Sequence, residues 1–315
     1  MAVARTWQNW IEQAQARGVP RQEAWYLAQS LAQITYASLR AHADEIPDHK
    51  TAQALSRMID RRVRGEPVAY LTQEREFYGR SFFVDERVLI PRHETELLVD
   101  LALNALLNRM RSVMSKQNLE PMESVAFLDL CTGSGIIALT LMREAKKAAD
   151  RESWLGSWIG VGADLSKDAL EVARINEGRL QKNESASSPV PLIDWRHADC
   201  FDLQDTSSWQ GLRFDVIATN PPYIAAQDTH LAQGDLRFEP KIALTDGADG
   251  LSFYRRIINH APQHLKPNGF LWMEHGCDQS LAIQKLLFEH LNWHKIETVR
   301  DAAGLPRCTG AQWLG

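Results

Sequence analysis

Cysteine is scarce in this chain, and no two cysteines stand at the spacing of a metal site or a redox motif. The four, Cys131, Cys200, Cys277 and Cys308, are scattered over 315 residues, so we expect free thiols in a reducing compartment and no bound metal. An excess of basic residues is also missing. With 35 Lys and Arg against 40 Asp and Glu, the formal net charge is -5, whereas nonspecific binding to phosphate backbones requires a basic surface. We therefore expect no stable nucleic-acid partner, and a protein substrate suits this charge better.

Long apolar runs are absent as well. No stretch approaches the ~20 apolar residues that a membrane span requires, and the first residues lack the basic-then-apolar pattern of a signal peptide. We expect no membrane partner, a cytoplasmic location and a monomer. The chain does have 44% hydrophobic and 24% charged residues, which is typical of a globular protein with one large domain and one smaller domain.

Apolar residues recur at helical spacing in the first 65 positions. A third helix should end at Gly65 and Pro67, where a left-handed cap and a helix breaker follow each other. Residues 1–70 are therefore predicted to form a small helical domain, which we expect to recognise the substrate. The three apolar stripes are Trp7, Trp10, Ile11 and Ala14; Ala24, Leu27, Ala28 and Leu31; and Leu55, Met58 and Ile59.

The pattern changes twice beyond this domain. Over residues 71–92 the apolar spacing shortens towards two, which predicts a β-hairpin linker with its turn at Gly79-Arg80. Over residues 93–315 short apolar strands alternate with amphipathic helices, which indicates an α/β fold with parallel strands in a doubly wound sheet. Strands are predicted at 125–130, 158–163, 192–197, 214–219, 270–273, near Ile296 and at 308–313.

A glycine-containing loop follows the first of these strands. The run Cys131-Thr132-Gly133-Ser134-Gly135 lies between the strand and a helix expected to begin near Ile136. In such a turn, glycines let a ligand approach the backbone and the amide donors of the helix N-terminus point at it. We expect these five residues to bind a nucleotide. Ala138 also satisfies the third small position of the nicotinamide fingerprint, so a dehydrogenase stays open on this loop alone.

Two aspartates end the next two predicted strands. Asp164 is placed to accept hydrogen bonds from the ribose hydroxyls of the nucleotide, although it lies further from the glycine loop than the ~20 residues of the dinucleotide pattern. A charge at a helix N-terminus beside Ser166 is the alternative. Asp199 would face the same crevice and accept from an adenine amino group, or it would be a solvated loop residue.

The tetrapeptide Asn220-Pro221-Pro222-Tyr223 follows the strand 214–219 at the carboxyl edge of the sheet. The two prolines fix the backbone and remove amide donors while keeping their carbonyls, and the asparagine adds a side-chain carbonyl. This site should accept N–H donors and hold a planar NH2 group, with the tyrosine ring against its face. A proline-rich turn after a strand is the alternative.

The tetrapeptide resembles the signature of methyltransferases that modify planar NH2 groups, either glutamine side chains or the exocyclic amine of adenine. Further runs occur in the order and at nearly the spacing of the PrmC (HemK) family of release factor glutamine methyltransferases, and the resemblance covers almost the whole chain. These runs are GEPVAYLT at 65–72, FYG at 77–79, LIPRHETE at 89–96, QGDLRFEP at 233–240, EHG at 274–276 and GLPR at 304–307.

The resemblance implies a seven-stranded class I methyltransferase (Rossmann-like) domain that uses S-adenosylmethionine. The donor would lie over the 131–135 loop, with Asp164 on its ribose and Asp199, Cys200 and Phe201 near its adenine. The substrate implied is the glutamine of the Gly-Gly-Gln motif of peptide chain release factors. Our hypothesis for the chemistry is that Asn220 and the Pro221 carbonyl accept both amide hydrogens, while Pro222 and Tyr223 complete the catalytic site.

Arg92, with Thr95 and Glu96, is expected at the substrate entrance, and a structural salt bridge is the alternative for these residues. The family usually has glycine where this chain has Cys131. A sister family that methylates a large-subunit ribosomal protein often carries Cys-Thr-Gly-Ser-Gly, so that substrate stays open. The Pro91–Glu96 and Gly304–Arg307 segments favour the release factor.

Three rivals outside protein methylation remain. One is a nucleotide-binding adaptor without catalysis, against which the intact Asn220-Pro221-Pro222-Tyr223 argues. An adenine-specific nucleic-acid methyltransferase would use the same acceptors after base flipping, but the net charge argues against it. A dehydrogenase would need a catalytic histidine or lysine beyond the cofactor half, and His275 is the sole candidate.

Overall fold

The structure is a computed structural model that describes residues 5–115, 124–182, 189–199 and 211–315. The chain divides into two compact units. The helical unit consists of Met1–Glu74 together with Ala232–Phe238, and the sheet unit consists of Arg75–Leu231 together with Glu239–Gly315. Across the described residues, no helix combines the length and apolar character needed to cross a membrane.

The helical unit is built on the stripes predicted from the sequence. The first helix buries Trp7, Trp10, Ile11 and Ala14, as expected, and it begins at a capping box between Thr6 and Asn9. The next two stripes are partly confirmed, because Leu31 and Met58 are only half-buried at the edge of the same core. Its helices are α1 (Trp7–Ala16), α2 (Arg21–Ala32), α3 (Tyr36–Ala41), α4 (His49–Val63) and α5 (Val68–Thr72).

A distant segment completes this unit at the end of α4. Gly65 has a φ of +94°, and a methyl group there would lie 1.7 Å from Nη2 of Arg237. The same guanidinium donates to the carbonyl of Arg64 at 3.0 Å, and Arg62 pairs with Asp235 at 3.7 Å. The 3-10 turn Gly234–Phe238 is thus held against the end of α4, at a glycine whose missing side chain makes room for the arginine.

The hairpin is present, but its turn lies one residue earlier than predicted. Strands β1 (Arg75–Phe77) and β2 (Arg80–Phe82) pair with Phe77 opposite Arg80. The turn is therefore Tyr78-Gly79, and both residues have positive φ, at 53° and 68°. Two left-handed residues are what a two-residue type I′ turn requires, which places the glycine second.

Seven strands form the sheet in the order β5-β4-β3-β6-β7-β9-β8. The five strands from β5 to β7 are parallel, and β9 runs antiparallel to both β7 and β8. This is the seven-stranded class I methyltransferase order, so the predicted fold is confirmed. The strands are β3 (Ser124–Leu130), β4 (Ser157–Asp164), β5 (Ile193–His197), β6 (Phe214–Thr219), β7 (Leu265–Glu274), β8 (Trp293–Arg300) and β9 (Pro306–Trp313).

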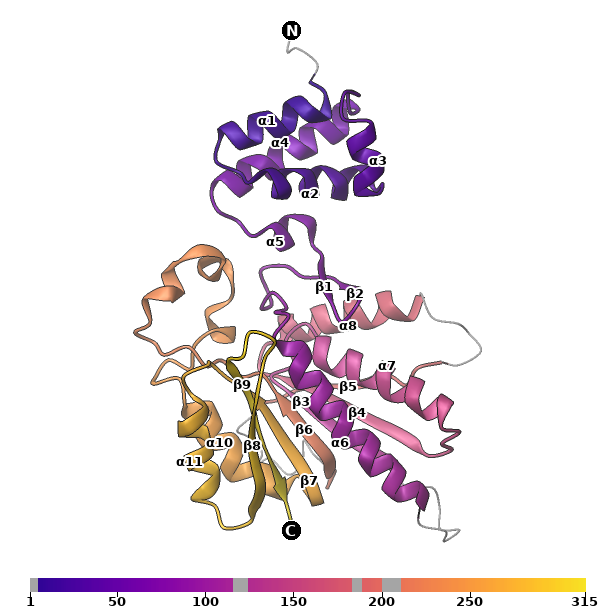
Figure 1. Ribbon diagram of the computed structural model, residues 1–315, viewed down its shortest axis with the longest axis vertical. Coiled ribbons are helices and arrows are strands. Elements are labelled where there is room, and N and C mark those ends of the chain that lie inside the picture. The colour runs from indigo at the N-terminus through magenta and orange to yellow at the C-terminus, as the bar shows by residue number, and fades with distance from the viewer. Residues whose placement is uncertain (1–4, 116–123, 183–188, 200–210) are drawn as a thin grey trace. The chain divides into compact units, whose positions relative to one another are not determined.

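Helices cover both faces of the sheet (Figure 1). Alternate residues of β3 face opposite cores: Phe127 packs with α6 and α7, whereas Leu128 packs with α10 and α11. The lysine- and alanine-rich stretch after the glycine loop extends α7, which explains why Asp164 lies so far along the chain. The helices are α6 (Thr95–Ser115), α7 (Ile136–Arg151), α8 (Lys167–Lys182), α10 (Ser252–His260) and α11 (Ser280–Phe288).

Candidate active site

A cavity of the sheet unit lies at the carboxyl ends of the parallel strands. It is lined by residues that follow β3, β4, β5 and β6, among them the loop residues Cys131–Ser134, Asp164, Asp199 and Asn220. The strand order changes direction between β3 and β6. In an open α/β sheet that switch point is where helices leave opposite faces and a ligand crevice remains.

The glycine loop has three residues in the left-handed region. The φ angles of Cys131, Gly133 and Gly135 are 61°, 55° and 80°. The amide of Thr132 donates to the carbonyl of Ala163 at 2.9 Å, which ties the loop to the end of β4. Cys131 adopts a conformation that favours glycine, so its backbone is strained where the family pattern has glycine.

A buried carboxylate lies beneath the loop. Asp129 is fully buried at the end of β3 and accepts hydrogen bonds from the Thr132 hydroxyl and, at 3.0 Å, from the Ala138 amide. Burial raises the pKa of this carboxyl to about 7, against the lowering effect of the two hydrogen bonds. The carboxylate links Thr132 of the loop to the first turn of α7.

Asp164 has the alternative role considered for it, beside Ser166, and it also lines the cavity. Its Oδ2 accepts from the Gly133 amide and its Oδ1 from the Ser166 amide, both at 2.8 Å. Ser166 in turn caps α8 by accepting from the Ala169 amide at 3.1 Å. Burial is the main cause that raises the pKa of Asp164. The Leu165 amide also donates to this carboxylate. A carboxylate has about four acceptor sites, so capacity for a further donor remains.

Two further residues predicted near the adenine, Cys200 and Phe201, lie outside the described residues. Asp199 itself lines the cavity, as do Leu165 and Ala198. The amide of Ala198 donates to the carbonyl of Asp164 at 3.1 Å, which holds this strand end against its neighbour.

Asn220 projects from the end of β6 and lines the cavity. Its Nδ2 donates to Oγ1 of Thr95, the first residue of α6, at 3.3 Å. Thr219 fixes the strand end, since its hydroxyl donates to the carbonyl of Leu130 at 2.7 Å. With the amide nitrogen held by Thr95, the asparagine Oδ1 is the end left to accept from a ligand.

The tetrapeptide is not wholly in the cavity wall. Pro222 lines it together with Asn220, whereas Pro221 and Tyr223 do not. Tyr223 is half-buried and its carbonyl accepts from Nε2 of Gln279 at 2.9 Å. Burial raises the pKa of its hydroxyl to about 12. The phenol therefore stays protonated and acts as a packing surface or a hydrogen-bond donor.

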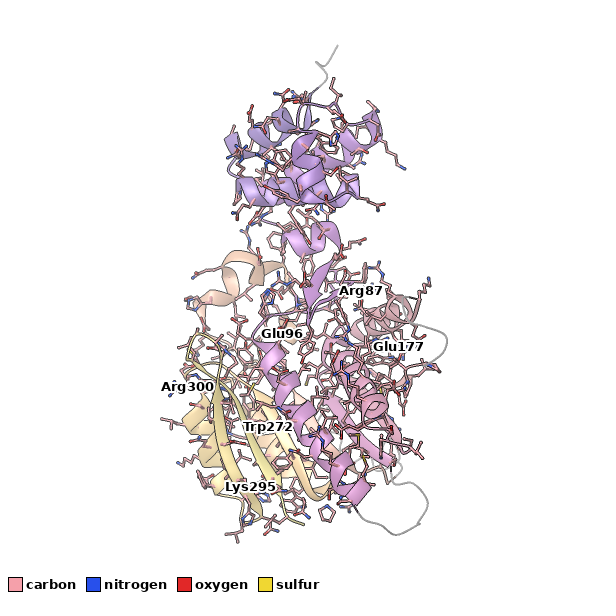
Figure 2. The ribbon with its side chains drawn as sticks, turned by 45° about the vertical axis from the view of Figure 1, so that its right-hand side comes forward. Arg87, Glu96, Glu177, Trp272, Lys295 and Arg300 are labelled. Atoms are coloured by element: carbon pink, nitrogen blue, oxygen red, sulfur yellow. The ribbon has the colours of Figure 1, made fainter. Side chains whose placement is uncertain are left out.

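Arg92 lines the cavity and also forms the salt bridge that was its alternative role. Its guanidinium pairs with Glu239, whose side chain is fully buried and also accepts from the Ile90 amide at 2.9 Å. Glu96 (Figure 2) does not line the cavity; it accepts from the amide of Tyr78 at 2.9 Å and so caps the hairpin turn. Thr95 lines the cavity.

His275 has no access to the cavity. It is fully buried, with Nε2 at 2.8 Å from the Thr309 hydroxyl and Nδ1 at 2.8 Å from the Gly276 carbonyl. Burial lowers the pKa of the imidazole, so the ring is neutral. This removes the one candidate for a dehydrogenase acid or base.

Some lining residues were not found by reading the sequence. Phe253 and Arg256 are three positions apart on one face of α10, and Arg87 (Figure 2) pairs with Asp85 at 2.7 Å and with Glu171 at 3.2 Å. Helical spacing could have grouped the α10 pair. Nothing in the sequence places that helix against the cavity.

The sheet order and the glycine loop, with the Asn-Pro-Pro-Tyr segment at the end of β6, define a class I methyltransferase. The family model described as "N-6 DNA Methylase" matches residues 91–291, and the one described as "PrmC N-terminal domain" matches residues 6–72. The chain belongs to the release factor glutamine methyltransferase family.

Three relatives that carry this family name match the chain over most of their own length. The protein from Neisseria gonorrhoeae is 39% identical over 297 residues, covering 94% of this chain and 94% of its own. The one from Burkholderia pseudomallei is 39% identical over 277 residues, covering 88% and 86%. The one from Bordetella pertussis is 39% identical over 293 residues, covering 93% and 95%.

Proposed function

We propose that this protein transfers a methyl group from S-adenosylmethionine to the side-chain amide nitrogen of the glutamine in the Gly-Gly-Gln motif of peptide chain release factors. The observation that carries the proposal is the Asn220 side chain, held by its nitrogen so that its oxygen can accept, at a cavity suited to a nucleoside. The full-length similarity to proteins named release factor glutamine methyltransferase supports the substrate.

The residues around the glycine loop fit the methyl donor. Gly133 lines the cavity, and a methyl group added to it would meet no atom within 4 Å, so the backbone leaves room for a ligand. The carboxylate of Asp164 would accept from the ribose hydroxyls and that of Asp199 from the adenine amino group. When bound, S-adenosylmethionine supplies an electrophilic methyl group, and its sulfur keeps the electron pair of the broken S–C bond.

On the substrate side, the amide nitrogen is a weak nucleophile because its lone pair is delocalised into the carbonyl. The Asn220 Oδ1 and the Pro221 carbonyl would accept the two N–H groups, point the lone pair at the methyl group, and stabilise the positive charge that develops on nitrogen. Pro222 would form the wall beside the amide and Tyr223 would support it from behind. The methylated nitrogen then loses one proton to solvent water, which completes the transfer.

We assign Arg92 to substrate binding at the rim of the cavity, where its guanidinium pairs with Glu239. We assign substrate recognition to residues 1–70 and the chemistry to residues 93–315, with residues 71–92 as the linker. We further propose a cytoplasmic monomer without a stable nucleic-acid partner, supported by the net charge of -5 and by cysteines without disulfide partners among the described residues.

The test is transfer of labelled methyl to four purified acceptors: a release factor, its variant lacking the Gly-Gly-Gln glutamine, a large-subunit ribosomal protein and duplex DNA. Label should enter the intact release factor alone. Asn220→Ala should slow this transfer on the order of 10²- to 10³-fold, as loss of one oriented acceptor does. Label on DNA would favour an adenine methyltransferase, to which the N-6 DNA Methylase match lends weight. Label on the ribosomal protein would favour the sister activity.

A further inference from the structure

A side-chain amide presents two opposite ends, a donor and an acceptor, and Asn220 can serve a substrate NH2 group only with its oxygen toward it. If the amide turned by half a rotation, its own N–H groups would face those of the substrate. The orientation of this one side chain therefore decides whether the cavity accepts or repels the substrate. The Nδ2···Oγ1 contact of 3.3 Å with Thr95 is long for a single hydrogen bond that has this task.

A second group stands beside this contact. Glu274 ends β7, the neighbour of β6 in the sheet, and Thr219 pairs with Met273. Because the two strands are parallel, Asn220 and Glu274 follow at the same level. Glu274 and Thr95 are each 1% exposed, and Glu274 does not line the cavity. The carboxyl thus lies behind Asn220, away from the ligand.

The Glu274 carboxyl is incompletely paired. Its Oε2 is buried without a hydrogen-bond partner among the described residues. Burial raises its pKa to about 7, while hydrogen bonding with Thr95, the charge of Arg307 and hydrogen bonding with Asn220 lower it, and the charge of Glu94 raises it. The other titratable side chains that interact with its charge are Tyr223, Tyr254 and Cys308.

A buried, partly unsatisfied carboxylate costs stability, so a structural role alone accounts poorly for its presence. We propose that Glu274 is a positioning residue which, together with the Thr95 hydroxyl, holds the Asn220 amide nitrogen and thereby keeps Oδ1 directed at the substrate. The proposal rests on the proposed function of the cavity. It adds the group that orients the acceptor.

The charge state of Glu274 enforces this orientation. An ionised carboxylate has no proton to donate, so it favours the N–H end of Asn220 and disfavours the oxygen end. A protonated carboxyl can donate to that oxygen, and the inverted amide then becomes accessible. Methyl transfer should therefore fall as the pH falls through about 7. This fall in activity at acid pH, the acid limb of the pH profile, is not diagnostic by itself, because the pKa of Asp129 is also raised to about 7.

The experiment compares kcat, and the KM for S-adenosylmethionine, of the full chain with release factor as acceptor between pH 5.5 and 9. Glu274→Gln should lower kcat about 10- to 100-fold above pH 7, the range expected for a hydrogen bond to a charged group, and should remove the acid limb. The KM for S-adenosylmethionine should stay within about twofold, because Glu274 does not line the cavity and the substitution removes no contact with the methyl donor. Glu289→Gln, at the exposed C-cap of α11, is the matched control that leaves both unchanged.

Thr95 gives an independent variant pair. Thr95→Val removes the hydroxyl at constant shape and should lose activity, whereas Thr95→Ser keeps the hydroxyl and should recover most of it. If the wild-type enzyme methylates the release factor and Glu274→Gln keeps both its kcat and its acid limb, the inference is overturned while the function stands.

If the wild-type enzyme labels no release factor, the proposed function is wrong. The positioning role of Glu274 can then still be tested by NMR on the protein without substrate. The side-chain NH2 resonances of Asn220, assigned by comparison with Asn220→Asp, should shift in wild type as the pH passes 7. They should not shift there in Glu274→Gln. Resonances that are insensitive to pH in wild type, or that titrate equally in the variant, would overturn the positioning role.

Discussion

Gly135 should be the least replaceable residue of the glycine loop, although it does not line the cavity. Its φ of +80° places it in the left-handed region, and a methyl group there would lie 2.8 Å from Cη2 of Trp195 and 3.0 Å from Cβ of Ala173. The indole has little freedom to withdraw, because its Nε1 donates to Oε2 of Glu177 (Figure 2) at 3.0 Å. The Ala173 backbone, at 3.3 Å, belongs to α8.

Two costs add in Gly135→Ala. A left-handed alanine costs about 1–2 kcal/mol, and overpacking against a helix and a held ring costs roughly 1–3 kcal/mol. We therefore expect a loss of about 2–5 kcal/mol in the free energy of unfolding. Gly133→Ala is the matched control: its φ is +55° but no atom lies within 4 Å of the new methyl group, so only the backbone cost applies.

Urea unfolding of the ligand-free protein measures both variants, and hydrogen exchange of β3 and β4 peptides reads the sheet unit separately from the helical unit. The loss of unfolding free energy caused by Gly135→Ala should be smaller in a Trp195→Leu background, because the indole ring that the methyl group would meet is then absent. Equal losses for Gly133→Ala and Gly135→Ala, or no coupling to Trp195, would refute the packing argument.

Three further predictions concern Cys131 in this loop and the two aspartates that accept hydrogen bonds from it, Asp129 and Asp164. Cys131→Gly should raise the free energy of unfolding by about 1 kcal/mol, because a side chain at a φ of 61° is relieved; an unchanged urea midpoint would show no strain there. Asp129 keeps its proton in the folded state to about pH 7 but releases it near 4 when unfolded, so wild-type stability should fall as pH rises between these values. Asp129→Asn should lack this fall, gaining relative to wild type by no more than about 4 kcal/mol, which urea titrations at pH 4.5 and 7.5 measure. Asp164→Asn should weaken S-adenosylmethionine binding at least about tenfold in calorimetry, since one ribose acceptor is lost; equal affinity would remove Asp164 from the ribose.

The parts of the site that could be predicted share one property: each lies at the end of an apolar strand. Asp164 and Asn220 end parallel strands, and parallel strands bring their carboxyl ends to one edge whatever the loops do. It was harder to predict which residues of a segment line the cavity. Pro222 lines the cavity, whereas its neighbours Pro221 and Tyr223 do not.

Residues that act through other residues were not predictable from their own surroundings. Glu274 meets Asn220 only because β7 lies beside β6 in one register, and Thr95 joins them because α6 begins over the same strand ends. The hairpin turn was displaced for a different reason. Tyr78 takes a positive φ, which tyrosine rarely does, and no local pattern signals that.

The helical unit is not a continuous piece of chain, and this bears on how the protein is made. Its last segment, Ala232–Phe238, is synthesised only after Arg75–Leu231 of the sheet unit. The Arg237 guanidinium that lies over Gly65 therefore reaches α4 only late in translation. A fragment that ends at Glu74 would keep the helices but lose this contact. We expect such a fragment to be less stable than the unit in the whole chain, so the beginning of this protein depends on residues that are translated much later.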